Sequence, residues 1–228
     1  MNHLWVGDID LRSMGLIINT PPTKPGIVMR AEAVTIPGRD GVKMVYDGAI
    51  DESQFDFIVF LPREYAQNLS ALRAKLSGEI EFSYEDTTAY YKGRVSKFDM
   101  KPLDFGDGYT GTLSIMAVPL KYLSDPEAVT ITASGQSVEN PYDAYSCPEI
   151  VISGSGNSEL SIGDINIAIT GQDADITIDT EERAAYESGE ECGGKVTGDF
   201  PTLPPGETEI TFSGGITAIT INPRWRRL

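Results

Sequence analysis

Few of the side chains that commonly carry out catalysis are placed for it in this sequence. His3 is the single histidine, so a Ser–His–Asp triad would depend on a residue near a terminus that we expect to be mobile. We therefore interpret His3 as an ordinary surface residue. The 34 acidic residues make chance carboxylate pairs unavoidable, so a hydrolase that uses two acids stays open as an alternative, although no motif supports it.

The densest group of carboxylates is the best candidate for a metal site. It consists of Asp173, Asp175, Asp179 and Glu181. A calcium loop requires acidic residues at alternate positions and a turn glycine. Here Ile176 and Ile178 interrupt the group at the spacing of a strand, so we expect a solvated strand face, with a calcium site as the alternative.

Two further patterns resemble functional motifs, but the residues and elements around them do not fit the functions. Gly106–Gly111 matches G-x-G-x-x-G, yet a proline-containing loop precedes it and a strand-like run follows, whereas a dinucleotide site needs a strand and then a helix. Cys147 and Cys192 are too few for a disulfide scaffold and have no basic neighbours to activate a thiolate. We expect both to be reduced, and a disulfide between them is the alternative. We thus expect no catalytic residue, no metal and no cofactor.

Composition excludes several classes of partner. The 228 residues include 18 basic and 34 acidic side chains, for a net charge of −16. So negative a chain is unsuited to holding nucleic acid by phosphate neutralisation or to docking on an anionic membrane. No apolar run is long enough to span a bilayer, and the N-terminus does not resemble a secretory signal. Trp225 among three arginines could stack on nucleic acid bases, but we expect it to dock on the fold with its neighbouring charges in water.

Negative charge is concentrated in the second half of the chain. Residues 1–125 hold 13 basic and 17 acidic side chains, whereas residues 126–228 hold 5 basic and 17 acidic. A shift of this size, beside the turn-forming Ser124–Pro126, predicts a domain boundary near residue 125. We therefore expect two domains, 1–125 and 126–228.

The first domain reads as strands with one helix. Strand-like runs cover 28–36, 42–50, 55–60, 79–84, 89–98 and 110–118. Asp40-Gly41 between the first two runs indicates a hairpin. Tyr65, Leu69, Leu72 and Leu76 follow helical spacing, so we predict a helix near 62–77 that opens at Pro62 and stops at Ser77-Gly78.

The second domain alternates apolar and polar residues in short runs. The pattern holds around Ile150, Leu160, Ile167, Ile176 and Ile219. We predict turns at 154–157, 163–164, 171–173 and 213–215, where glycine and polar residues gather. Short strands every eight to twelve residues with one apolar face indicate an antiparallel β-sandwich. The fold class is therefore all-β.

Four segments, in order, resemble the distal tail proteins (Dit) of siphophages, which are hub components of the tail. They are Val34–Gly41, Leu61–Gly78 with the two runs that follow it (Ile80–Tyr84 and Tyr90–Val95), Asn140–Gly156 with Cys147–Ile150, and Gly206–Leu228 with Phe212–Gly215 and Asn222–Arg226. Each segment alone is weak, and none is a catalytic signature. Their order and spacing over nearly the whole chain carry the resemblance.

The resemblance implies a structural virion protein of a phage or prophage, made in the bacterial cytoplasm and located at the tail tip. The family's N-terminal domain is barrel- or sandwich-like with one helix and forms a hexameric ring. Its C-terminal domain is a galectin-like sandwich that points outward. The implied partners are further copies of the chain, the tail-tube protein, baseplate proteins and, in some cases, a receptor-binding protein. DNA passes through the ring without specific binding.

The resemblance also changes the interpretation of the hairpin tip. Pro37, Gly38, Arg39, Asp40 and Gly41 become candidate subunit contacts, and a plain exposed tip is the alternative. A second function also stays open, in which the C-terminal sandwich is a carbohydrate-binding or adhesion module. That function needs an exposed aromatic platform, for which Tyr142, Tyr145 and Tyr186 are the candidates.

Overall fold

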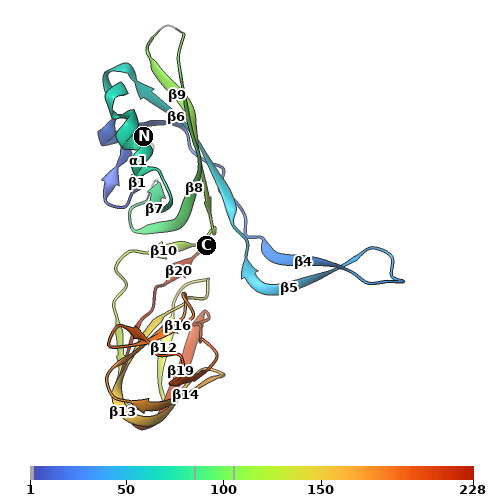
Figure 1. Ribbon diagram of the computed structural model, residues 1–228, viewed down its shortest axis with the longest axis vertical. Coiled ribbons are helices and arrows are strands. Elements are labelled where there is room, and N and C mark those ends of the chain that lie inside the picture. Colours follow the sequence, from blue (N-terminus) through green and yellow to red (C-terminus); the bar gives the residue numbers. More distant parts are fainter. Residues whose placement is uncertain (1–2, 85, 105) are drawn as a thin grey trace. The chain divides into compact units, whose positions relative to one another are not determined.

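The protein folds into two compact units, Met1–Lys121 and Tyr122–Leu228 (Figure 1). The structure is a computed structural model that describes residues 3–84, 86–104 and 106–228. Both units are built from antiparallel strands around their own hydrophobic cores. The chain is all-β with a single α-helix among the described residues, as the sequence predicted. No helix in the described ranges has the length and apolar character needed to cross a membrane.

The N-terminal unit is organised around seven strands that pair in the order β2-β1-β7-β8-β9-β6-β3. Its strands are β1 (Leu4–Val6), β2 (Ile9–Asp10), β3 (Ile17–Thr20), β6 (Ser53–Pro62), β7 (Glu79–Tyr84), β8 (Ala89–Pro102) and β9 (Gly108–Ala117). Two 3₁₀ helices, η1 (Leu11–Met14) and η2 (Arg63–Asn68), and one α-helix, α1 (Leu69–Lys75), complete it. A separate pair, β4 (Met29–Thr35) and β5 (Val42–Ile50), forms its own two-stranded sheet.

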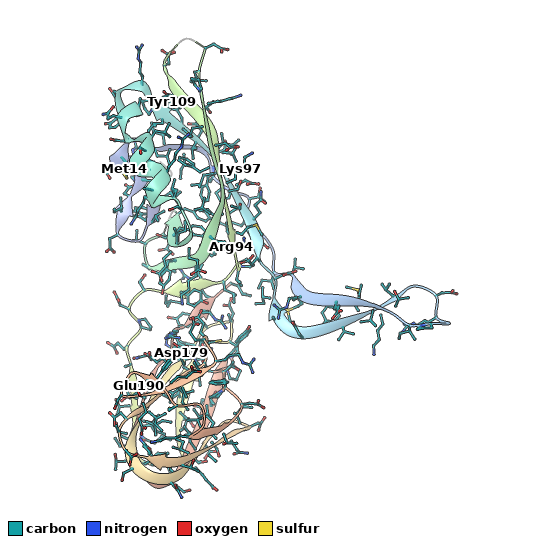
Figure 2. The ribbon with its side chains drawn as sticks, in the orientation of Figure 1. Met14, Arg94, Lys97, Tyr109, Asp179 and Glu190 are labelled. Atoms are coloured by element: carbon teal, nitrogen blue, oxygen red, sulfur yellow. The ribbon has the colours of Figure 1, made fainter. Side chains whose placement is uncertain are left out.

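The core of this unit comes from strict alternation along β6. Phe55, Phe57, Val59 and Leu61 are fully buried, whereas Ile58 on the other face is 46% exposed. The Phe55 ring lies 5.6 Å from that of Phe82 and 5.0 Å from that of Tyr91, centroid to centroid. Met14 and Tyr109 pack against the edge of the same core (Figure 2). An aromatic cluster of this kind joins β6 to β7 and β8.

The predicted helix exists but begins later than expected. Arg63–Asn68 is a 3₁₀ helix, and only Leu69–Lys75 is α-helical. Pro62 precedes the helix with an extended backbone (ψ 151°) rather than occupying its first turn. The apolar spacing was informative, because Leu72 and Leu76 are buried and Tyr65 and Leu69 pack against the core. The stop near Gly78 is also confirmed, with that glycine at a φ of +73°.

The C-terminal unit contains eleven strands around an isoleucine-rich core. They are β10 (Lys121–Leu123), which starts one residue before the unit, β11 (Val129–Ile131), β12 (Gln136–Asn140), β13 (Glu149–Ile162), β14 (Ile165–Gln172), β15 (Ile176–Asp179), β16 (Ala184–Glu187), β17 (Glu190–Glu191), β18 (Val196–Gly198), β19 (Gly206–Asn222) and β20 (Arg226–Arg227). β13 pairs with β15 through its first half and with β14 through its second half. β19 pairs with β12 through its first half and with β11 through its second half.

Two of the predicted turns are wrong because the chain stays in strand conformation and bends instead. β13 runs through 154–157, and β19 runs through 213–215. Their mutual pairing is irregular at this point, where Gly154 faces Ile216 and Ser158 faces Gly214. The glycines mark a pair of facing bulges, and a bulge bends a strand without ending it. The bend lets β13 and β19 contribute to both layers of the sandwich.

The sequence analysis expected the C-terminal arginines to lie in water, but Arg226 is buried and Arg224 is half-buried. Trp225 docks on the core, as predicted, and is 9% exposed. Arg226 is buried as well, with its Nε donating to the carbonyl of Tyr145 at 2.9 Å and its guanidinium 4.4 Å from that ring. Arg224 donates two hydrogen bonds to Asp179, at 2.9 and 2.8 Å. A planar guanidinium can stack and fork in this way without remaining solvated.

Candidate subunit interface

The hairpin β4–β5 is exposed along nearly its whole length. It pairs with no other strand among the described residues, and residues 32–48 are all exposed. Figure 1 shows β4 and β5 extending away from the other strands of their own unit. We call β4, β5 and the tip between them the arm.

The tip of the arm is formed by the five residues singled out from the sequence. Gly38 and Gly41 adopt φ of +82° and +76°, a left-handed backbone that side chains with a Cβ rarely adopt. The Arg39 amide donates to the carbonyl of Ile36 at 3.1 Å, which closes the turn. Pro37 and Asp40 lie beside these residues, fully in solvent. The hairpin is thus confirmed, while the role of its tip in a subunit contact stays a prediction.

The two charged side chains of the tip, Arg39 and Asp40, are both exposed. In the part of the chain that the structure describes, neither Arg39 nor Asp40 forms an ion pair within 4 Å. Both side chains therefore keep their full capacity for charge-assisted hydrogen bonds to another molecule.

The strands of the arm carry a feature that sequence reasoning missed. Residues directly opposite each other in an antiparallel pair point to the same face. Ala31, Ala33 and Thr35 lie opposite Tyr46, Met44 and Val42, respectively. These six uncharged residues form what we call the apolar face of the arm. The sequence predicted a strand over 42–50 but gave no sign of this uncharged face.

The opposite side of the arm is charged. Its residues are Arg30, Glu32, Val34, Lys43, Val45 and Asp47. Arg30 donates to Asp47 across the strands at 2.6 Å. That guanidinium holds the pKa of the Asp47 carboxyl below its usual range. We call this side the charged face of the arm.

The candidate calcium group is used for internal contacts. Asp179, labelled in Figure 2, binds Arg224, and Asp173 accepts a hydrogen bond from Lys195 at 3.1 Å. Within the described residues, no three acidic, histidine or cysteine side chains are arranged to hold a metal ion. Cys147 and Cys192 are both free thiols, and burial raises the pKa of each. His3 hydrogen-bonds to Asp10 at 2.7 Å and stacks on Trp5.

Glu187 anchors the loop between β14 and β15 by hydrogen bonds. We therefore predict that its ionisation contributes to the stability of the fold and that this contribution is lost in acid. It accepts hydrogen bonds from Lys195 and from the amides of Asp173 and Ala174, which lower its pKa to about 2. A lowered folded-state pKa stabilises the fold above the unfolded-state value and loses that effect on acidification. The stability difference between wild type and Glu187→Gln should therefore be largest above about pH 4.5 and narrow towards pH 2.

Urea denaturation of both proteins across this pH range measures the difference. Glu190→Gln is the matched control, because Glu190 is exposed on the neighbouring strand β17 (Figure 2). A difference that does not change with pH would contradict the assignment.

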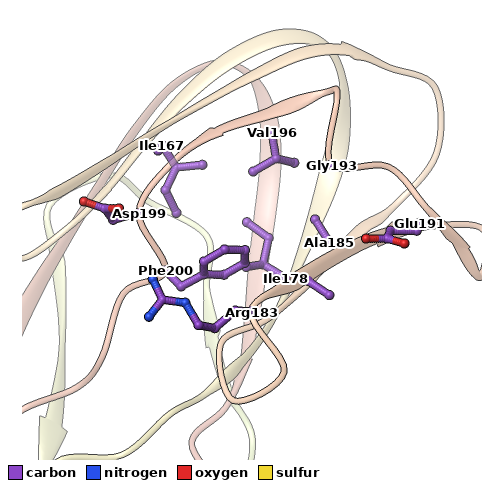
Figure 3. Close-up of a pocket in the computed structure, with 11 residues that line it drawn as sticks. Ile167, Ile178, Arg183, Ala185, Glu191, Gly193, Val196, Asp199 and Phe200 are labelled. Atoms are coloured by element: carbon purple, nitrogen blue, oxygen red, sulfur yellow. The ribbon is translucent and has the colours of Figure 1, made fainter. Parts of the chain in front are cut away.

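The C-terminal unit offers little aromatic surface for a sugar. Tyr142 packs against Trp225, with ring centroids 6.3 Å apart, and Tyr145 is covered by Arg226. A cavity of about 250 Å³ opens beside β16 and β18. Figure 3 shows Phe200 at its centre with the Arg183 side chain against the ring, 5.7 Å from the centroid. This face of Phe200 is therefore already occupied by a cation, and Tyr186, the third candidate, is half-buried on β16.

The complete chain shares its fold with a solved phage protein. The crystal structure described as SPP1 Dit (gp 19.1), a hub of the adsorption apparatus in phages that infect Gram-positive bacteria, aligns over 100% of both chains with a TM-score of 0.72 and 15% identity. A chain of the phage P2 baseplate, in its activated conformation with calcium, aligns over 100% of this chain and 98% of its own, with a TM-score of 0.48 and 8% identity. No protein-family model and no curated protein sequence matches this chain. The fold is therefore that of the SPP1 Dit protein.

Proposed function

We propose that this chain is a structural subunit of a phage or prophage tail, and that its copies form a hub ring between the tail tube and the baseplate proteins. The observation that supports this most is the fold shared with SPP1 Dit over the whole of both chains. The likeness covers both units and their order along the chain, which a chance similarity between single β-sandwiches does not explain. The C-terminal unit faces outward in this proposal, where it can dock further tail proteins.

The N-terminal unit builds the ring in this proposal, and the number of copies is six. A cyclic ring is a heterologous assembly, in which one patch of each subunit meets a different patch of its neighbour. The arm, including its tip at Pro37–Gly41, supplies one of these patches. Its exposure along 32–48 fits an element that acquires its contacts only in the assembly.

The charge distribution fits this arrangement. The 17 acidic and 5 basic residues of 126–228 keep an outward domain soluble and repel DNA from it. The first half of the chain is nearly balanced. A ring built from the N-terminal units would thus present no large excess of basic residues that could hold DNA.

Electron microscopy of the purified protein in negative stain tests the proposal. We expect rings with six-fold symmetry and a central hole, formed alone at high concentration or together with the tail-tube protein. Particles that remain single subunits under both conditions would rule out a self-assembling ring. A glycan array is the parallel test of the carbohydrate-binding alternative. We expect no specific binding, because Arg183 stacks on the ring of Phe200 and Arg226 stacks on the ring of Tyr145.

A further inference from the structure

The cavity beside β16 and β18 leads from the surface of the C-terminal unit to its hydrophobic core. Its volume is about 250 Å³, and its wall includes the core residues Ile167 and Ile178, which are only 2% and 1% exposed. The rest of the apolar wall consists of Ala184, Ala185, Val196 and Phe200. Such a wall suits an apolar group, or the aliphatic stem of a longer side chain.

Two carboxylates stand where the cavity opens to solvent. Glu191 and Asp199 both line the cavity and are exposed. Figure 3 shows them on opposite sides of the Phe200 ring. Apolar wall and acidic opening together match a side chain with an aliphatic stem and a cationic head, which is the description of arginine or lysine.

The cavity already holds one guanidinium, that of Arg183 from the same chain. The group lies over the Phe200 ring, 5.7 Å from the centroid, as a planar cation does on an aromatic face. Arg183 is itself exposed, and among the described residues it forms no ion pair within 4 Å. Its φ is +55°, a left-handed backbone that residues with a Cβ rarely adopt and that is commoner at binding sites than elsewhere. The ring therefore favours a cation, and its present occupant is replaceable.

We propose that this cavity binds an arginine side chain of another protein, which displaces Arg183 from the Phe200 ring. The stem of the incoming arginine packs against the apolar wall, and its guanidinium stacks on the ring and binds the carboxylates at the opening. The inference rests on the proposed function only in that the C-terminal unit faces other tail proteins. It adds a site, the chemistry of the partner and a residue that fills the site until the partner arrives.

The charge around the cavity favours a basic partner. Residues 182–199 contain five acidic and two basic side chains. Of the two basic residues, Lys195 is already bound to two carboxylates, at 2.6 and 3.1 Å, and the other is Arg183. Within the described ranges, neither Glu191 nor Asp199 forms an ion pair within 4 Å. These carboxylates attract a cationic group, whereas an acidic surface, such as the C-terminal unit of a further copy of this chain, is repelled.

Free strand edges beside the cavity favour a polypeptide over a small cation. β18 contributes Val196 and Gly198 to the wall and, among the described strands, pairs with β14 alone. β17 contributes Glu191 and pairs with β16 alone among the same strands. An unpaired edge can accept an extended segment through main-chain hydrogen bonds, and an adjacent pocket then selects one of its side chains. We therefore expect the arginine to lie in an extended segment of the partner.

Fluorescence anisotropy of a labelled peptide measures binding by the full chain. The probe is the peptide Thr-Val-Arg-Val-Thr, with fluorescein at its N-terminus and an amidated C-terminus. The matched peptide carries citrulline in place of arginine, which keeps the shape of the side chain and removes its charge.

The chain offers a matched pair of variants, Glu191→Gln and Glu190→Gln. Both glutamates are exposed on β17, but of the two only Glu191 lines the cavity. Arg183→Ala is the third variant and removes the present occupant of the ring. Thermal unfolding followed by circular dichroism verifies that each variant is folded.

We expect the wild type to bind the arginine peptide at least about fivefold more tightly than the citrulline peptide. Arg183→Ala should bind the arginine peptide at least about threefold more tightly than the wild type, because the site is no longer occupied in the free protein. Glu191→Gln should weaken binding by at least about threefold. Glu190→Gln should change it by no more than about 1.5-fold, since that charge is exposed and lies outside the cavity.

Four results would overturn the inference. They are equal binding of the two peptides, binding by Arg183→Ala that is no tighter than that of the wild type, equal effects of the two glutamine variants, and no binding by either the wild type or Arg183→Ala at millimolar peptide. Anisotropy reports binding by single subunits as well as by rings. A failure to form rings, which would rule out the proposed function, is therefore distinguishable from a failure to bind the peptide.

Discussion

Replacing Phe55 with alanine is expected to lower the free energy of unfolding of the N-terminal unit by about 3–5 kcal/mol. Phe55 is fully buried and lies at the centre of the aromatic cluster, against Phe82, Tyr84 and Tyr91. The truncation removes its own transfer free energy and leaves a cavity that three large rings on two other strands cannot close. A loss of this size is a large part of the stability of a small domain.

Urea denaturation with a single tryptophan reports on this unit alone. The sequence has two tryptophans, Trp5 in β1 and Trp225 in the C-terminal unit. In a Trp225→Phe background, the fluorescence of Trp5 follows the N-terminal unit. Ile58→Ala, on the exposed face of the same strand, is the control and should cost less than about 1 kcal/mol. Similar losses for the two variants would show that the alternation of β6 does not place Phe55 in the core.

Gly215→Ala is expected to destabilise the C-terminal unit by about 3 kcal/mol, at the upper end of the usual cost of overpacking. A Cβ at this position would overlap the carbonyl oxygen of Ser155 on the facing strand. The neighbouring position is also crowded, because a Cβ on Gly154 would lie 2.5 Å from the carbonyl oxygen of Gly215. Backbone atoms cannot swing away as a flexible side chain can, so the bend shared by β13 and β19 would have to open.

Gly194→Ala is the matched control, because a Cβ there has no atom within 4 Å. Its effect should remain within about 0.5 kcal/mol. Trp225 fluorescence in a Trp5→Phe background measures both variants. If Gly215→Ala were as stable as the control, the two strands would not approach each other closely at the bend.

Most of the fold was predictable because its strands alternate with a period of two. Strand-like composition identified β5 and β7, and alternation identified β15, to within a residue or two of their ends. Prediction from alternation failed at two glycine-containing segments, because such a segment can form either a turn between strands or a bend within one strand. A glycine pair between two apolar runs is the usual sign of a turn, but at 154–157 and 213–215 it marks a bend inside a strand. Only the register of one strand against the other distinguishes these cases, and single residues do not encode the register.

Less of the candidate interface could be predicted. The hairpin and its tip followed from Asp40-Gly41. That the whole arm is exposed did not follow, because alternation of apolar and polar residues predicts a strand with one buried face. The buried arginines were missed for a related reason. Hydropathy places Arg226 in water, whereas its planar group fits between Tyr145 and the thiol of Cys147.

The two bent strands have a consequence for how the chain folds during synthesis. The hydrophobic core of the N-terminal unit ends with Ala117 in β9, so this unit can complete its core early. The C-terminal unit cannot, because β19 pairs with residues of β11, β12 and β13 that lie about 50 to 90 residues before their partners. Pairing over such separations is slow. Until Asn222 leaves the ribosome, a folded N-terminal unit with its arm is tethered to an acidic, unpaired segment. The dense negative charge of that segment then opposes aggregation until β19 has been synthesised and can pair with the earlier strands.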